Sequence, residues 1–251
     1  RDIYVTNDGA LTIGGIGELG TLRSNGGDIG ISATGDLTLQ QTVDAGSGDV
    51  VLRSSSGAIV DDNHGGEPPH VYALVDIIGQ NAVLEAETGI GSLDALETEI
   101  ATLDAYNDRN GNIRIDEMAA GGDLAVQQAR VRGGIGSIWL TVARGNLTVL
   151  AGGDGVLLTN ERNETGLIWL DANVTVAASD EPLRGNVIVN ADVRSGNSVT
   201  ITADHDVTGS TDGDILGFAG VTITADDNDG GPGGGDNGTI QLAGAILAPD
   251  G

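Results

Sequence analysis

The sequence predicts an all-β protein whose backbone coils into a parallel β-helix, or β-solenoid, with about 20 residues in each complete circuit, here called a coil. Three observations predict it. A short phrase of Gly, then Asp or Asn, then apolar-x-apolar recurs along the chain. Its copies lie roughly 8 to 13 residues apart, and alternate copies lie about 19 to 25 residues apart. Aromatic residues are only 2% of the 251 residues, so aliphatic side chains must fill a narrow interior.

Each copy of the phrase is typical of a turn followed by a short strand. Gly and Asn or Asp tolerate the positive φ of a tight turn. The two apolar residues then lie on one face, because strand side chains alternate. A β-sandwich would give similar spacing, but its strands more often carry a large buried aromatic residue, and the solenoid is therefore favoured. The clearest copies begin at Gly27, Gly35, Gly48, Gly111, Gly122, Gly145 and Gly185.

A longer repeat relates residues 1–60 to residues 111–170. Residues 2–5 align with 112–115 at an offset of 110, and residues 29–31 align with 138–140 at an offset of 109. Residues 61–110 form an excursion between the copies, and residues 171–251 diverge. The chain begins in mid-pattern, so residues 1–251 are predicted to be one continuous solenoid segment of a longer protein.

The excursion contains a segment that departs from the strand pattern. Leu93, Leu96, Ile100 and Leu103 follow helical spacing. We expect a short helical turn from Leu93 to Glu97 and a strand after it.

Composition excludes several classes of function. The formal net charge is −26, and all 11 basic residues are arginines. This charge repels phosphate backbones and argues against nucleic-acid binding. Without lysine there is no Walker A loop or Schiff base, and without cysteine there is no thiolate metal site or cysteine nucleophile. No apolar stretch approaches the length that a membrane-spanning helix needs, so no membrane insertion is expected.

Three stretches carry a further resemblance. They are residues 1–13 (RDIYVTNDGALTI), residues 89–103 (GIGSLDALETEIATL) and residues 146–154 (NLTVLAGGD). They resemble the giant β-strand-repeat surface proteins of bacteria, the filamentous-haemagglutinin-like adhesins. The likeness covers most of residues 1–170. It implies a right-handed parallel β-helix that is extracellular or on the cell surface, and it brings no catalytic residues with it.

Two segments have the oxygen ligands that Ca²⁺ prefers. Asp108, Asn110 and Glu117 resemble part of an EF-hand loop with Gly111 at its sharp turn, although the first ligand position falls on Tyr106. The alternative is that Gly111 begins one more copy of the turn-strand phrase.

The second segment is the densest acidic and glycine-rich stretch, and its candidate ligands are Asp226, Asp227, Asp229 and Asp236. It departs from the nonapeptide calcium repeat, and a solvated loop is the alternative. Residues 61–70 are a similar excursion, whose carboxylates with His64 or His70 are a third metal candidate. No cofactor is required by any of these patterns, and Ca²⁺ is the ion that they would take.

Two tryptophans are candidates for binding. Alternation directs Trp139 outward, and the same holds for Trp169 if its neighbours face inward. Outward tryptophans stack on sugars or on another chain, unless a nearby loop covers them. Asn163 and Asn237 are candidate glycosylation sites, because each begins an N-x-S/T sequon in a predicted loop.

These patterns favour a structural role over catalysis. The first hypothesis is an extracellular adhesin shaft, surface stalk or filament subunit, which stacks head to tail with itself or continues in the same chain. The second is a polysaccharide lyase or hydrolase built on the same β-helix, but no feature selects a catalytic pair among 37 acids, so no catalytic residue is assigned. The third is a module that binds surface glycans or a partner through its tryptophans.

Overall fold

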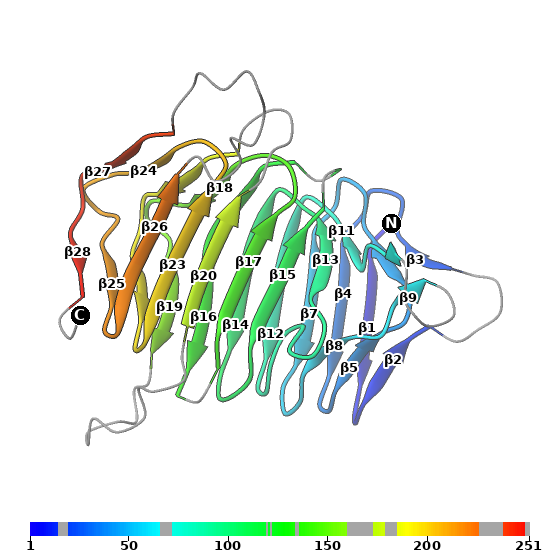
Figure 1. The fold of residues 1–251 in the computed structure, drawn as a ribbon. Helices are drawn as coiled ribbons and strands as arrows, with labels where there is room; N and C mark the ends of the chain where they lie inside the picture. The colour runs from blue at the N-terminus through cyan, green and yellow to red at the C-terminus, as the bar shows by residue number, and fades with distance from the viewer. Residues whose placement is uncertain are drawn as a thin grey trace.

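The computed structural model is an all-β protein that coils as a parallel β-solenoid with about 23 residues per coil (Figure 1). It describes residues 1–14, 20–65, 72–118, 120, 122–133, 136–159, 173–178, 185–225 and 238–248. The predicted fold is confirmed. No helix occurs in these ranges, so none of the described segments is a helix that could span a membrane.

Two parallel sheets form the main walls of the solenoid. In sheet 1, ten strands follow one another along the axis: β1 (Ile3–Asn7), β4 (Ile29–Ala33), β7 (Val50–Ser54), β12 (Asn81–Ala86), β14 (Thr102–Asn107), β16 (Leu124–Arg132), β18 (Leu147–Val149), β21 (Val187–Val189), β24 (Val207–Gly209) and β27 (Ile240–Leu242). Beside its last part run β19 (Gly155–Thr159), β22 (Val193–Ser195), β25 (Ile215–Gly217) and β28 (Ile246–Leu247).

Sheet 2 contains β3 (Thr21–Arg23), β6 (Thr42–Asp44), β11 (Ile77–Ile78), β13 (Leu96–Glu99), β15 (Ile113–Glu117), β17 (Ile138–Val142), β20 (Asn173–Ala178), β23 (Ser198–Ala203) and β26 (Gly220–Ala225). A three-stranded ladder of β2 (Leu11–Ile13), β5 (Leu37–Leu39) and β8 (Ile59–Asp61) joins it, because Ile90 bridges both Ile59 and Ile113. The strands β9 (His64–Gly65) and β10 (Tyr72–Ala73) pair antiparallel and lie outside these ladders.

The core is a stack of aliphatic side chains. In sheet 1, Ile29 pairs with Val50, Val50 with Ala82, and Ala82 with Leu103, each in parallel register. Among the described residues, the buried hydrophobic core consists of Ile, Leu, Val and Ala alone. The parallel register places like side chains above one another in successive coils, so the interior needs no aromatic side chain to fill it.

The Asp or Asn of the repeated phrase forms a hydrogen-bonded ladder along the solenoid axis. Its side-chain oxygen accepts the backbone N–H of the matching residue one coil further on. Asp123 accepts from Asn146 at 2.8 Å, Asn146 from Asn186 at 3.0 Å, and Asn186 from Asp206 at 3.0 Å. The same contact joins Asp28 to Asp49 at 2.9 Å. The phrase therefore repeats because each coil satisfies a backbone donor of the next coil.

At several copies of the phrase, glycine is required for a reason other than the positive φ that the sequence analysis predicts. Gly48 does not have a positive φ, but a Cβ on it would lie 2.2 Å from the carbonyl oxygen of Gly27 in the preceding coil. A Cβ on Gly136 would likewise lie 2.3 Å from the carbonyl oxygen of Gly111. Positive φ does occur at some copies, such as Gly145 with φ 124°. At Gly48 and Gly136, however, close approach of the neighbouring backbone requires the glycine.

The long sequence repeat relates strands of equal length in opposite sheets. Five-residue β1 in sheet 1 aligns with five-residue β15 in sheet 2, and three-residue β5 beside sheet 2 aligns with three-residue β18 in sheet 1. Near the N-terminus, each coil has its long strand in sheet 1 and two short strands opposite. From β20 onward the long strand lies in sheet 2. The second copy of the long repeat therefore has the same order of long and short strands as the first, but its long strands lie in sheet 2 instead of sheet 1.

The coils differ in the number of residues between matching ladder positions. Val187 pairs with Val207 and Leu124 pairs with Leu147, so these two coils are close to the average length. Leu147 pairs with Val187, so a much longer stretch of chain separates these two ladder positions. The ladder nevertheless continues in parallel register on both sides of this stretch.

The predicted helical turn from Leu93 to Glu97 is wrong. Residues 91–95 are irregular, and β13 begins at Leu96. Leu96, Ile100 and Leu103 are buried, whereas Leu93 is 90% exposed. The helical spacing arises by chance, because the four residues lie in different elements. Leu93 is in the loop before β13, Leu96 is on β13, Ile100 is in the turn after it and Leu103 is on β14.

Candidate functional site

Three acidic side chains meet at a buried position where the first long excursion leaves and rejoins the solenoid. Asp61 is the last residue of β8, Asp76 directly precedes β11, and Glu97 lies on β13. One carboxylate oxygen from each lies within 4.8 Å of the other two. All three residues are buried, and Asp76 is 0% exposed.

Strand register brings two of these acids together. Ile77 pairs with Thr98, so Asp76 lies opposite Glu97 in the adjacent coil. The backbone N–H of Asp76 donates to the Glu97 carbonyl at 2.8 Å, and the N–H of Glu97 donates to Oδ2 of Asp76 at 3.0 Å. These contacts hold Asp76 in place although β11 has only two residues.

Asp61 is held by the residues that follow it in the excursion. The backbone N–H of Asn63 donates to Oδ1 of Asp61 at 2.7 Å. The side-chain amide of Asn63 donates to the Val75 carbonyl at 3.2 Å, directly before Asp76. Asn63 therefore ties the outgoing end of the excursion to its returning end, which places Asp61 beside Asp76.

The cluster disfavours three ionised carboxylates. Burial, followed by the charge of Asp61, raises the pKa of Asp76 to about 9. The same two causes raise the pKa of Glu97 to about 7. Oδ1 of Asp76 is buried and receives no hydrogen bond from any described group. Buried like charges are stable only when protons or a cation neutralise them.

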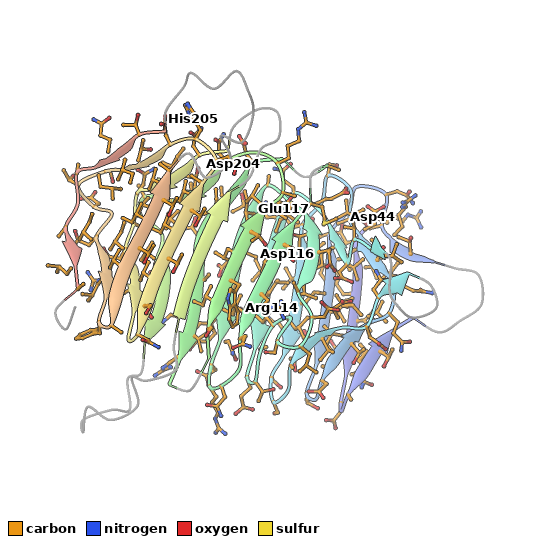
Figure 2. The ribbon with its side chains drawn as sticks, in the orientation of Figure 1. Asp44, Arg114, Asp116, Glu117, Asp204 and His205 are labelled. Carbon is orange, nitrogen blue, oxygen red and sulfur yellow. The ribbon has the colours of Figure 1, made fainter. Side chains whose placement is uncertain are left out.

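The predicted EF-hand-like ligands do not come together. Asp108 accepts a hydrogen bond from the Tyr106 hydroxyl at 2.9 Å and lies 3.7 Å from an Arg132 nitrogen. Asn110 is exposed beside it, whereas Glu117 is fully buried at the far end of β15 (Figure 2). The strand from Ile113 to Glu117 spans roughly 13 Å. The turn-strand alternative describes this segment, because β15 occupies the second half of the supposed loop.

Glu117 forms its own buried site. Its carboxylate accepts a 2.6 Å hydrogen bond from the Thr98 hydroxyl and a 2.9 Å hydrogen bond from the Ile100 N–H. Burial nevertheless raises its pKa from 4.5 to about 8. The carboxyl group is therefore mostly protonated in the folded chain at neutral pH.

The pKa of Glu117 leads us to expect stability that decreases as the pH rises. Because the folded pKa lies above the unfolded value, the folded chain binds more protons between these values. The contribution is complete below about pH 4.5, is lost as pH rises through about 8, and is on the order of 5 kcal/mol. Urea unfolding between about pH 5 and 8, in the presence of a chelator, measures how steeply the free energy of unfolding falls with pH. In the Glu117→Gln variant this fall should be less steep than in the wild type.

The control for this measurement is Asp212→Asn, which removes one charge from an exposed turn residue. It should leave the slope as in the wild type. Equal slopes in the Glu117→Gln variant and the control would contradict the assignment of the raised pKa to Glu117.

Trp139 faces outward, as alternation predicts, and its ring is partly covered. It lies on β17 beside Arg114 of β15, whose guanidinium carbon is 5.6 Å from the ring centroid. This is the geometry of a cation–π contact. The alternative in the sequence analysis was that a nearby loop covers Trp139. In the structure, the side chain of Arg114 covers part of the ring. Trp169, Asp226, Asp227, Asp229, Asp236, Asn163 and Asn237 lie outside the described residues.

A shallow groove on sheet 1 gathers arginines and acids from successive coils. It is lined by Arg53, Glu85, Glu87 and Asp108 among others. Arg53 bonds Glu85 at 2.8 Å, and Arg109 bonds Glu87 at 2.8 Å. These pairs link neighbouring coils.

Sequence reasoning identified the excursion as a metal candidate through Asp61, but it missed Asp76 and Glu97. His64, one of its proposed ligands, has no described side chain, and His70 lies outside the described residues. Comparison with family models, with curated proteins and with solved structures found no match to this chain. Its function therefore has to be argued from its own geometry.

Proposed function

We propose that this chain is a segment of an extracellular structural β-solenoid, which acts as an adhesin shaft, surface stalk or filament subunit. The observation that carries the proposal is the ladder of sheet 1, in which ten parallel strands follow one another from β1 to β27. Backbone hydrogen bonds and the aliphatic core both continue along the same axis. The resemblance of residues 1–170 to bacterial surface adhesins supports the extracellular location.

The ends of the solenoid are suited to contact with another copy. At one end, β1 has a partner strand on one side only among the described strands, and Tyr4 is 72% exposed. At the other end, Ile246 and Leu247 of β28 are 48% and 52% exposed. Unpaired strand edges with apolar side chains are templates for adding strands. Because the two ends differ, this contact is head to tail and leads to a fibre rather than a closed dimer.

Such a junction has a counterpart inside the molecule. The C-terminal end presents two short strands, β27 and β28, whereas the N-terminal end presents the longer β1 in the same sheet. Within the chain, nine-residue β16 pairs with both β18 and β19. A long strand can therefore carry two short strands in this fold. The net charge of −26 opposes lateral association of the rods.

Electron microscopy of purified protein over a range of concentrations tests the proposal. We expect linear rods of constant width whose lengths increase by whole subunits. Replacing Ile246 and Leu247 by lysine should abolish elongation, because it places charge on the end strand. Leu93→Lys is the matched control, since Leu93 is 90% exposed on the side of the rod. Single-length particles at every concentration, or rods that persist in the end variant, would contradict stacking.

A further inference from the structure

We propose that Asp61, Asp76 and Glu97 bind one calcium ion at the buried site where the first excursion meets the solenoid. The inference does not depend on the proposed shaft function, because it rests on the local arrangement of the three carboxylates.

The spacing of the carboxylates fits a shared ion. Calcium binds oxygen ligands at about 2.3–2.6 Å, so two ligands of one ion are at most about 5 Å apart. One oxygen from each of the three acids lies within 4.8 Å of the others. The three residues come from β8, from the residue before β11 and from β13, so the ion would be held from three separate segments.

Asp76 provides an independent indication of a ligand. It is 0% exposed, and its Oδ2 accepts the Glu97 N–H at 3.0 Å. Its Oδ1 is buried and receives no hydrogen bond from any described group. A buried carboxylate oxygen without a donor is costly, and a coordinated cation would remove that cost. Burial and the charge of Asp61 raise the pKa of Asp76, as expected for a buried carboxylate that has no cation beside it.

The donor set favours calcium over other common ions. Zinc prefers nitrogen and sulfur ligands, whereas these three donors are carboxylate oxygens. Magnesium keeps several of its waters and requires nearly ideal octahedral geometry. Calcium accepts irregular sets of oxygen ligands, and both oxygens of one carboxylate can bind it.

A calcium ion here would fasten the excursion to the solenoid. Asp61 and Asp76 lie at the two ends of residues 62–75, and Glu97 lies in the next coil. One ion would therefore join the outgoing strand, the returning strand and the coil above. Because the ion binds the folded chain, it should raise the melting temperature by mass action.

Calorimetric titration of calcium into protein stripped with a chelator tests the site. The matched variants are Asp76→Asn, which keeps the shape of the side chain, and Asp212→Asn, which removes the same charge from an exposed turn. We expect the wild type and Asp212→Asn to bind one ion that Asp76→Asn does not bind. At about 100 times the dissociation constant, calcium should stabilise by about 2.7 kcal/mol, which is a factor of roughly 100 in the folding equilibrium.

The melting temperature provides a second readout, with sodium chloride at equal ionic strength as the reference. It should rise with calcium in the wild type and in Asp212→Asn, but not in Asp76→Asn. An unchanged number of bound ions in Asp76→Asn would place the ion elsewhere and overturn the proposal. A wild type that binds no calcium would also overturn it, because protons alone would then neutralise the cluster.

Europium luminescence tests the site without a variant and covers the case in which Asp76→Asn does not fold. Lifetimes of bound Eu³⁺ in H₂O and D₂O count the waters on the ion. Calcium-type sites have about 6–8 ligands, and three carboxylates supply three to six of them, so about five waters or fewer are expected. A nearly complete shell of waters would show a surface ion and contradict the buried site.

Discussion

Gly48→Ala is expected to destabilise the solenoid by on the order of 3 kcal/mol. A Cβ at this position would lie 2.2 Å from the carbonyl oxygen of Gly27 and 2.5 Å from its carbonyl carbon. Both atoms belong to the backbone of the preceding coil, which cannot move aside without disturbing the pairing of β4 with β7. Chemical denaturation of the purified variant measures the loss as a lower midpoint.

Gly20→Ala is the matched control for Gly48→Ala. A Cβ on Gly20 would meet no atom of the described residues within 4 Å, and its φ is not in the left-handed region. Alanine there should be neutral, or should stabilise by up to about 1 kcal/mol by restricting the unfolded chain. Equal effects at the two positions would contradict the close approach of successive coils at Gly48.

Leu84→Ala is expected to cost about 2–5 kcal/mol. Leu84 is completely buried on β12, between Leu52 of β7 and Ala105 of β14. The walls on both sides are held by parallel ladders, so they cannot close on the cavity without breaking hydrogen bonds. Thermal and urea unfolding measure the loss.

Leu93→Ala is the control for Leu84→Ala. Because Leu93 is 90% exposed, its truncation should change the free energy of unfolding by less than about 0.5 kcal/mol. A cost at Leu84 no larger than the cost at Leu93 would mean that β12 does not bury this side chain in a packed core.

The sequence predicted the fold well because the solenoid repeats its local chemistry in every coil. Each copy of the phrase marks a strand start, and the shortage of aromatic residues reflects a core of Ile, Leu, Val and Ala. Sequence alone did not reveal the reason for Gly48, because the clash involves a coil that is distant in the chain. Leu93 was misread because a loop between two strands can imitate helical spacing over a few residues.

The candidate site was only partly predictable. Asp61 stood out in an acidic stretch, but Asp76 and Glu97 join it through pairing that resumes after the excursion. No local pattern gives the register across such an insertion. Glu117 is different, because alternation from Ile113 and Ile115 places it on the inward face. The alternating pattern could therefore have predicted that Glu117 is buried, but the EF-hand interpretation assigned it as a calcium ligand instead.

Disulfide trapping tests the central claim, that successive coils pair in parallel. The chain has no cysteine, so engineered pairs have no background. Thr200 of β23 is the partner of Thr222 of β26, and Thr202 is the partner of Thr224. In a parallel ladder, partners are about 4.8 Å apart and diagonal positions are about 8 Å apart, and a disulfide requires Cα atoms within roughly 4.4–6.8 Å.

Double-cysteine variants at 200/222 and 202/224 should therefore form intramolecular disulfides on mild oxidation. The crossed pairs 200/224 and 202/222 should remain reduced. An antiparallel hairpin would give the reverse result, since it places position 200 opposite 224 and position 202 opposite 222. Formation of the crossed pairs, with the direct pairs reduced, would contradict the parallel solenoid.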